Sequence, residues 1–186
     1  MLLLVGLGNP GSNYTNTRHN IGFKIIAAIN AHFKLSKQKP KFKGLLTTGN
    51  IADKKVYAIK PLTFMNNSGI CIRELLEYFK IDAEDVIVFH DDLDVEFGKI
   101  KAKFGGSDAG HNGIASIDKF IGKDYSRVRI GIGKQENQIK VADYVLQNFD
   151  EDEKTGIEKI SKNINDSISI LVEKKLDLFS STVNNK

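Results

Sequence analysis

Short apolar runs alternate along the chain with longer segments in which apolar residues recur every three or four positions. The short runs have the length of buried strands, and the longer segments have the spacing of amphipathic helices. The predicted strands cover residues 2–7, 56–59, 85–92, 99–104 and 127–133. The predicted helices cover residues 20–33, Ser68 to Phe79, about 113 to Phe120, and 150–176.

This alternation predicts a single α/β domain over residues 1–186, with a mixed, mostly parallel twisted sheet and helices on both faces. Hydrophobic residues make up 41% of the chain, enough for a full core. We expect residues 34–44, which are rich in lysine, to form a basic loop, and residues from about 178 to 186 to form a frayed tail. Ligands of such folds bind beyond the carboxyl ends of the strands.

Composition narrows the class of protein. The first apolar run, residues 2–5, is too short for a membrane span or a signal peptide, so we expect no membrane association. Cys71 is the only cysteine, which excludes a disulfide within the chain and a cysteine zinc cluster. A cytoplasmic location is the simplest expectation.

The net charge of +4 is unevenly distributed along the chain. Residues 1–52 contain lysine and arginine but no acidic residue, and the first carboxylate is Asp53. Such asymmetry is expected of a protein that binds a polyanion, although a solvated lysine surface would give the same composition.

Basic residues also follow a strand period near the middle of the chain. Lys101 and Lys103 alternate with apolar residues, so their side chains share one face of a predicted strand. Arg127 and Arg129 repeat this pattern on a later strand. The two strands therefore predict either a contact surface for phosphates or an ordinary solvated sheet face.

The glycine-rich turn in VGLGNPGSNYTNTRHNIG, residues 5–22, resembles a nucleotide-binding loop. A dinucleotide site also needs an acidic residue about 20 positions further on, and none occurs before Asp53. Pro10 removes a backbone donor that a phosphate would use, and the lysine of a P-loop is missing. The turn is therefore predicted to present Asn9 and to place His19 at the start of a helix.

Two histidines stand in polar surroundings typical of functional residues. His19 and His111 lie next to glycine-bearing turns, and an asparagine follows each of them directly. Neither fits an apolar period.

The segment HDDLD, residues 90–94, ends a predicted buried strand. His90 with Asp92 or Asp94 could bind a metal ion, since histidine and carboxylate ligands suit zinc or manganese. Alternatively, a carboxylate here orients a catalytic imidazole. Strand alternation places His90 and Asp91 on opposite faces, so we expect them to serve different surroundings.

Five segments in the same order resemble bacterial-type peptidyl-tRNA hydrolases. They span about residues 3–133 and read VGLGNPGSNYTNTRHNIG, KPLTFMNNSG, HDDLD, KAKFGGSDAGHNG and RVRIGIG. The resemblance implies an esterase that cleaves the bond between a peptide and the 3′ end of tRNA. It also implies a monomeric cytoplasmic enzyme that needs no cofactor and no metal ion.

The resemblance further implies roles for particular residues. His19 is the general base that activates water, Asp91 orients its imidazole, and Asn9 positions the water or the ester carbonyl. The implied substrate-binding residues are Tyr14, Phe64, Asn66, His111 and Asn112. The implied tRNA-binding residues are Lys101, Lys103 and Arg129.

Two residues depart from the pattern of the family. Asp108 stands where a small residue is usual, and Ala109 stands where glycine is usual. We expect these changes to alter loop motion or substrate affinity without abolishing the chemistry. Two other functions stay open, namely an RNA-binding relative without catalysis and a metal-dependent hydrolase that uses His90.

Overall fold

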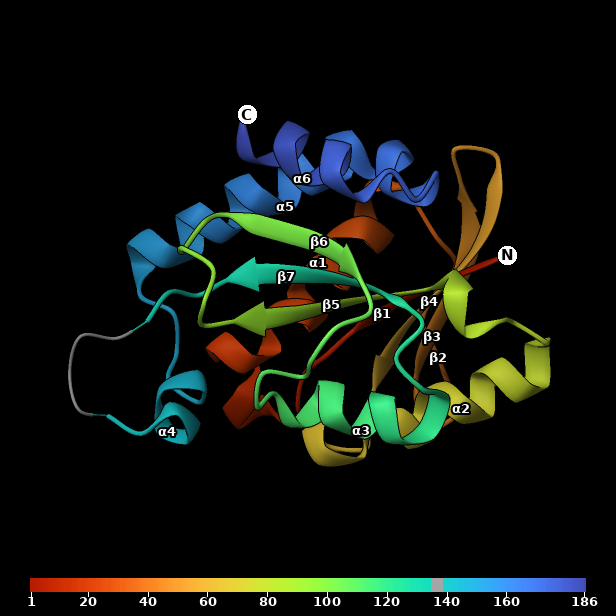
Figure 1. Cartoon of the computed structure of the whole chain (residues 1–186), viewed down its shortest axis with the longest axis horizontal. Coiled ribbons are helices and arrows are strands. Elements are labelled where there is room, and N and C mark those ends of the chain that lie inside the picture. Colours follow the sequence, from red (N-terminus) through yellow and green to blue (C-terminus); the bar gives the residue numbers. More distant parts are fainter. Residues whose placement is uncertain (135–138) are drawn as a thin grey trace.

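The computed structural model describes residues 1–134 and 139–186. Figure 1 shows three layers, with a central sheet between two groups of helices. The strands are β1 (Leu2–Gly6), β2 (Lys39–Lys41), β3 (Gly44–Ile51), β4 (Lys54–Pro61), β5 (Val86–Asp92), β6 (Ile100–Phe104) and β7 (Ser126–Gly131). None of the helices in the described ranges is long and apolar enough to cross a membrane.

The seven strands form one mixed sheet in the order β2-β3-β4-β1-β5-β7-β6. The central strands β4, β1, β5 and β7 are parallel to one another. The outer strands β2, β3 and β6 pair antiparallel. The predicted single-domain α/β class, with a mixed sheet covered on both faces, is confirmed.

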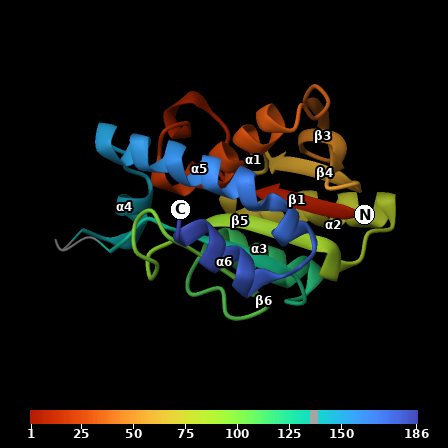
Figure 2. The same ribbon diagram turned by 90° about the horizontal axis from the view of Figure 1, so that it is seen from above.

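In the described part of the chain, six α-helices accompany the sheet: α1 (Ile21–His32), α2 (Ser68–Phe79), α3 (Asn112–Ile121), α4 (Val141–Val145), α5 (Glu151–Val172) and α6 (Leu176–Asn184). Apolar residues of α1, α5 and α6 form the core on one face of the sheet. Those of α2 and α3 form the core on the other face. Figure 2, seen from above, shows α5 and α1 crossing the central strands.

Glycines at the opening turn allow a helix to approach the sheet closely. A Cβ atom on Gly22 would lie 2.3 Å from the backbone nitrogen of Leu7 and 2.4 Å from the carbonyl oxygen of Phe89. A Cβ atom on Gly6 would lie 2.2 Å from the carbonyl oxygen of Gly22. The start of α1 therefore packs directly on β1 and β5, which brings the residues before it next to the end of β5.

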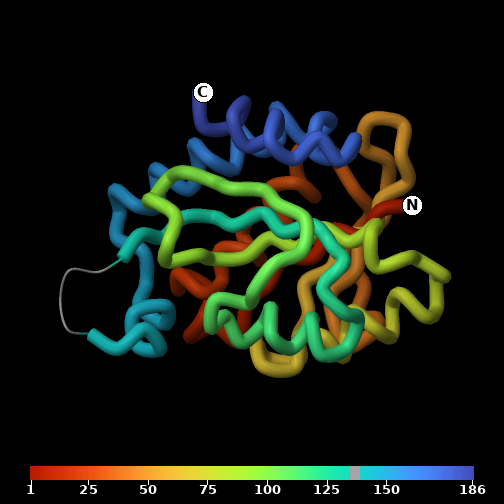
Figure 3. Tube along the Cα trace, viewed as in Figure 1, coloured from red at the N-terminus to blue at the C-terminus, as the bar shows by residue number. Residues whose placement is uncertain are grey.

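The expected frayed tail is wrong. Residues from Leu176 to Asn184 form α6, with Phe179 fully buried and Val183 2% exposed. The side chain of Asn184 accepts a hydrogen bond from the backbone N–H of Ile100 and donates one to its carbonyl oxygen. Figure 3 shows this segment folded back along β6. Its polar residues therefore serve to cover an edge strand.

The expected basic loop at residues 34–44 is also only partly right. It contains β2, a short edge strand whose three residues are all exposed. The longer β3 beside it was not predicted, and neither was the five-residue helix α4. These elements carry few buried apolar positions, so the hydrophobic pattern gave little signal for them.

Candidate active site

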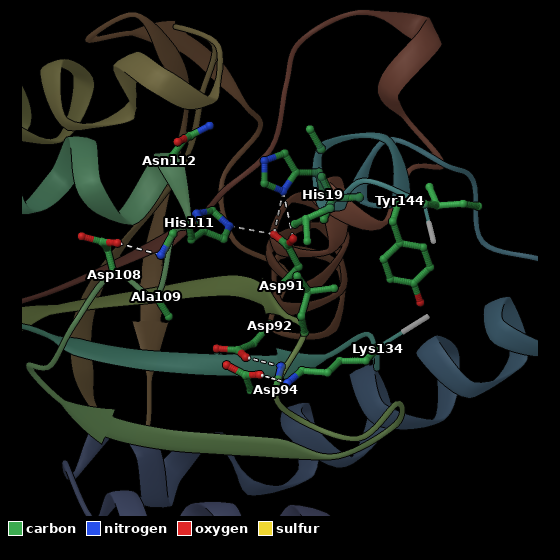
Figure 4. A pocket seen from close by; sticks show the side chains of 16 residues that line it. His19, Asp91, Asp92, Asp94, Asp108, Ala109, His111, Asn112, Lys134 and Tyr144 are labelled. Atoms are coloured by element: carbon green, nitrogen blue, oxygen red, sulfur yellow. Dashed lines mark hydrogen bonds and ion pairs between the residues drawn. The ribbon is translucent and has the colours of Figure 1, made fainter. Parts of the chain in front are cut away.

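A cavity of about 620 Å³ opens at the carboxyl end of the central strands. The end of β5, the loop before α3, and α4 provide most of its walls. Figure 4 shows His19, Asp91 and His111 meeting at one side of it, with Tyr144 on the opposite side. The predicted residues His19, Asp91, His111 and Asn112 all line this cavity.

His19 and Asp91 form the central pair of the site. His19 lies in the 3₁₀ turn η2 (Arg18–Asn20), directly before α1. Its Nδ1 is 3.0 Å and 2.9 Å from the two carboxylate oxygens of Asp91. Nδ1–H therefore donates to Asp91, which leaves the Nε2 lone pair of His19 free to accept a proton.

Asp91 is ionised although it is buried. Burial alone would raise the pKa of its carboxyl group, but the charges and hydrogen bonds of His111 and His19 outweigh burial and lower the pKa well below its usual range. The side chain of Asp91 is only 3% exposed. A buried, permanently negative group thus faces the imidazole of His19.

His111 binds the same carboxylate from the other side. Its Nε2 is 2.8 Å from Oδ1 of Asp91. Its Nδ1 accepts hydrogen bonds from the backbone N–H groups of Gly113 and Ile114, at the N-terminus of α3. Both ring nitrogens are therefore engaged, so any contact of His111 with a substrate is made by its carbon atoms.

His19, Asp91 and His111 also form a possible metal-binding group, because their ligand atoms lie within 4.8 Å of one another. A ligating Nε2 must carry a lone pair, and neutral histidine would then carry its proton on Nδ1. Nδ1 of His111 instead faces two N–H donors. The hydrogen bonds of His111 thus fit a proton on Nε2 better than a metal ion.

The alternative metal site at HDDLD is not assembled. Nδ1 of His90 bonds to the carbonyl oxygen of Asp91, and the ring does not line the cavity. Asp92 pairs with Arg129, while Asp94 pairs with Lys134. Figure 4 shows Asp92 and Asp94 directed away from His19 and His111.

His90 is neutral, because burial lowers its pKa to about 3. Its ring does not line the cavity, as strand alternation predicted, but it packs against that of His111, with centroids 5.0 Å apart.

Asn9 is held in one orientation by its neighbours. The backbone N–H of Asn9 donates to Oδ1 of Asn20 at 2.8 Å, and the backbone carbonyl oxygen of Asn9 accepts from Nδ2 of Asn20 at 2.9 Å. Its own Oδ1 accepts the backbone N–H of Met65 at 2.8 Å. The amide oxygen is thus occupied, and the Nδ2 group of Asn9 stays available as a donor. The role of Asn20 was not predicted.

The other predicted substrate-binding residues lie outside the cavity lining. Asn66 is exposed in the turn η3 (Met65–Asn67), whose first residue is bound by Asn9. Phe64 is 54% exposed, and its ring meets that of Tyr14 edge to face, with centroids 6.5 Å apart. Phe64 has a φ of 58°, which is strained for a bulky residue and is typical of functional positions.

The predicted basic surface is only partly accessible. Lys101 pairs in register with Arg129 across β6 and β7, so two like charges lie side by side. Nε of Arg129 is 2.6 Å from Asp92, and its side chain is 16% exposed. Burial, then Arg129 and Arg127, lower the pKa of Lys103. Such crowding of cations is unfavourable unless an anion binds there.

Arg127 shares the face predicted for the basic residues but is buried. It is 1% exposed and donates to Asp118 and to the carbonyl oxygen of Ser107, at 2.8 Å each. It therefore fastens the loop before α3 and does not reach solvent.

The two unusual loop residues are built into one tight turn. Oδ1 of Asp108 accepts a hydrogen bond from the backbone N–H of Gly110 at 2.7 Å. The backbone carbonyl oxygen of Asp108 accepts one from the backbone N–H of His111. Ala109 has a φ of 50°, a left-handed conformation that favours glycine. Ala109 therefore adopts a conformation in which glycine would be less strained, two residues before His111.

Arg18 connects the turn η2 to the far wall of the cavity. Its guanidinium binds both carboxylate oxygens of Glu153, at 2.9 Å and 2.8 Å, and the carbonyl oxygen of Asn148 at 3.0 Å. It also lies over the ring of Tyr144, which lines the cavity. In the motif RHN, Arg18 thus binds Glu153, His19 binds Asp91 and Asn20 binds the backbone of Asn9. Of these three residues only His19 was predicted to belong to the site.

A mixed α/β sheet carries a histidine–carboxylate pair in a cavity at its carboxyl end, and the described residues that line this cavity include no serine, threonine or cysteine. This arrangement is typical of a hydrolase in which water is the nucleophile. Comparison with known proteins identifies the family. Residues 3–186 match the family model described as peptidyl-tRNA hydrolase. The chain therefore belongs to the peptidyl-tRNA hydrolase family, and thus to the carboxylic-ester hydrolases.

Known peptidyl-tRNA hydrolases match this chain over most of their length. A curated peptidyl-tRNA hydrolase of Pelagibacter ubique is 78% identical over 186 residues, covering 100% of both chains. That of Bacillus subtilis is 48% identical over 160 residues, 86% of this chain and 85% of its own. A crystal structure of a mutant peptidyl-tRNA hydrolase from Acinetobacter baumannii has a TM-score of 0.92 at 34% identity, covering 99% of this chain and 94% of that one.

Proposed function

We propose that this protein hydrolyses the ester bond between a peptide and the 3′ end of tRNA, and so recycles tRNA from prematurely released chains. Family membership supports the reaction class. The single observation that carries the mechanism is the buried pair formed by His19 and Asp91, because it leaves one imidazole nitrogen free beside a cavity.

His19 acts as the general base. Its Nε2 removes a proton from a water molecule while the water oxygen attacks the ester carbonyl. The imidazolium that forms is stabilised by the ionised carboxylate of Asp91, which also fixes the tautomer with the proton on Nδ1. The proton then passes to the departing ribose oxygen, which releases tRNA and the free peptide.

Asn9 stabilises the developing negative charge. Because its Oδ1 is held by Met65, only its Nδ2 group can face the substrate, and this group donates. It therefore suits the ester carbonyl oxygen better than a water molecule that must itself donate to His19. An oxyanion donor of this kind contributes about 2.7–4 kcal/mol to transition-state stabilisation.

Asn66 and Asn112 bind the peptide main chain. Both side chains are exposed, and Asn112 lines the cavity. An amide both donates and accepts, so it can bind a peptide unit whatever the side chain is. Tyr14 and Phe64 meet edge to face, and Phe64 directly precedes Met65, whose backbone binds Asn9. This aromatic pair suits the terminal nucleoside.

The tRNA phosphates contact the face of β6 and β7 that carries Lys101, Lys103 and Arg129. The adjacent like charges of Lys101 and Arg129 support this assignment. Nε of Arg129 is used by Asp92, which leaves its terminal amino groups for a phosphate. Recognition is then of phosphates and shape, without reading a sequence.

The proposal includes a monomeric cytoplasmic enzyme that uses no metal ion or organic cofactor. The hydrogen bonds of His111 support proton chemistry at the cluster with Asp91, as described above. Sedimentation of the purified protein tests the monomeric state.

The test is release of N-acetylated amino acid from N-acetyl-aminoacyl-tRNA by the wild-type protein, with and without EDTA, together with binding of deacylated tRNA. The proposal expects cleavage that persists in EDTA and tRNA binding that weakens steeply with salt. Binding without cleavage would favour the RNA-binding alternative. Cleavage that is lost in EDTA and restored by zinc or manganese would favour the metal-dependent alternative.

A further inference from the structure

Asp91 is shared between two imidazoles, whereas the proposed reaction needs only one. His19 lies on one side of the carboxylate and His111 on the other, with N–O distances of 2.9 Å and 2.8 Å. The rings of the two histidines are 4.9 Å apart between centroids. His111 therefore touches the group that controls the base, although it has no free nitrogen for the substrate.

The hydrogen bonds of His111 determine its tautomer. Nδ1 accepts N–H groups of Gly113 and Ile114 at 3.1 Å and 3.3 Å, so it carries no proton. The proton must then lie on Nε2, where it is donated to Asp91. A second proton on Nδ1 would remove the cap of α3 and would place a cation at the positive end of the helix. The Nε2–H group of His111 is thus directed at Asp91 as a donor.

The other charged groups around the carboxylate are already compensated. On β5, His90 is neutral and packs against His111. Asp92 is paired with Arg129 from β7, and Asp94 is paired with Lys134. Asp108, from the loop before α3, binds the backbone of that loop. His19 and His111 are therefore the partners that set how much negative charge Asp91 presents.

We propose that His111 is a positioning residue that donates to Asp91, fixes the carboxylate toward His19 and limits how strongly it holds the His19 imidazolium. A carboxylate with no second donor would stabilise the imidazolium more and would keep the base protonated at higher pH. The next residue in the chain is Asn112, which is proposed to bind the peptide. The N-terminus of α3 therefore carries both a peptide-binding residue and the residue that adjusts the basicity of His19. This inference rests on the proposed function.

Two substitutions separate the two nitrogens of His111. In His111→Asn, the amide oxygen can replace Nδ1 and cap α3, since asparagine is a favourable capping residue, but the side chain is too short to reach Asp91. In His111→Gln, the terminal amide can replace Nε2 and donate to Asp91. The first variant keeps the cap and loses the donor, and the second keeps the donor.

The experiment measures kcat/KM for N-acetyl-aminoacyl-tRNA against pH, with Tm and tRNA binding measured in parallel. For His111→Asn we expect an unchanged tRNA Kd, a fall in kcat of about tenfold or more, and an acid-side midpoint raised by about 1–2 pH units, the size expected for one lost hydrogen bond to a charged group. His111→Gln should return the midpoint to the wild-type value. A purely structural role would move Tm but leave the midpoint unchanged.

The proposal is overturned if His111→Asn keeps the wild-type midpoint, or if both variants shift it equally. Imidazole ¹⁵N NMR of the wild-type protein gives a second readout that needs no turnover. It should show His111 protonated on Nε2 alone, and a proton on Nδ1 would contradict the proposal. Failure of the proposed function, by contrast, would show as absence of cleavage by the wild-type enzyme.

Discussion

Replacing Asp91 with asparagine removes the charge of the central pair while keeping its size. The carboxylate accepts N–H groups from both His19 and His111, whereas an amide has a single accepting oxygen. The amide introduced by Asp91→Asn would satisfy one imidazole and turn its own N–H group toward the other. Either the N–H group of His19 or that of His111 then faces the amide N–H group and has no acceptor. In both cases the His19 imidazolium loses the negative charge that stabilises it.

The magnitude follows from the interaction that is lost. A hydrogen bond to a charged group contributes about 1.5–3 kcal/mol. At about 1.4 kcal/mol for each factor of ten, the loss lowers kcat by about 10- to 150-fold. Reversal of the His19 tautomer would add to this, so we expect a decrease of about 100-fold or more. KM and the Kd for tRNA should change little, because Asp91 is buried and its carboxylate is bound by His19 and His111.

The assay is single-turnover cleavage of N-acetyl-aminoacyl-tRNA, with enzyme in excess. Asp94→Asn is the matched control, because Asp94 also lines the cavity but pairs with Lys134 on the surface. The control should stay within about twofold of wild type, as expected for an exposed ion pair. A decrease of less than about fivefold in Asp91→Asn, or an equal decrease in both variants, would refute the reasoning.

Three further outcomes are expected. Replacing Lys101 or Lys103 with alanine should weaken tRNA binding and lower the slope of log Kd against log salt by about 0.7–0.9 for each lost phosphate contact, as measured by titration at several salt concentrations; an unchanged slope would remove that lysine from the interface. Ala109→Gly should change KM more than kcat, because it removes the strain of a left-handed alanine in the loop next to the site. Steady-state kinetics measure both constants, and a larger change in kcat than in KM would mean that the loop governs the chemical step. Burial raises the pKa of the Cys71 thiol to about 12, so a thiol reagent at pH 8 should modify it only after urea unfolds the protein, and rapid labelling of the native enzyme would contradict its burial.

The central strands could be predicted from the sequence because they are buried on both faces and read as continuous apolar runs. All seven residues of β5 are buried, for example. β2 has no buried residue and α4 has only five residues, so neither produces a hydrophobic period. The helix α6 was missed because its cover of β6 depends on hydrogen bonds that Asn184 and Ser180 accept from the backbone of β6, which a hydrophobicity pattern does not record.

Periodicity predicted which face a side chain takes but not what covers that face. Arg127 and Arg129 do share one face, yet Ser107 and Asp118 cover the first of them. The pairing of His19 with Asp91 joins residues 72 positions apart, and it was expected only through the family resemblance. The bond from His111 to the same carboxylate has no sequence signal, because it depends on how the loop before α3 turns.

The most direct test of the account is single-turnover hydrolysis of N-acetyl-aminoacyl-tRNA by His19→Asn, compared with wild type and with His32→Asn, which alters an exposed histidine outside the site. Binding of tRNA is measured on the same preparations. The account predicts that His19→Asn binds tRNA as wild type does and loses at least about a hundredfold in cleavage rate, within the range of general base catalysis, while His32→Asn cleaves normally. Cleavage by His19→Asn at close to the wild-type rate would contradict the assignment of His19 as the base.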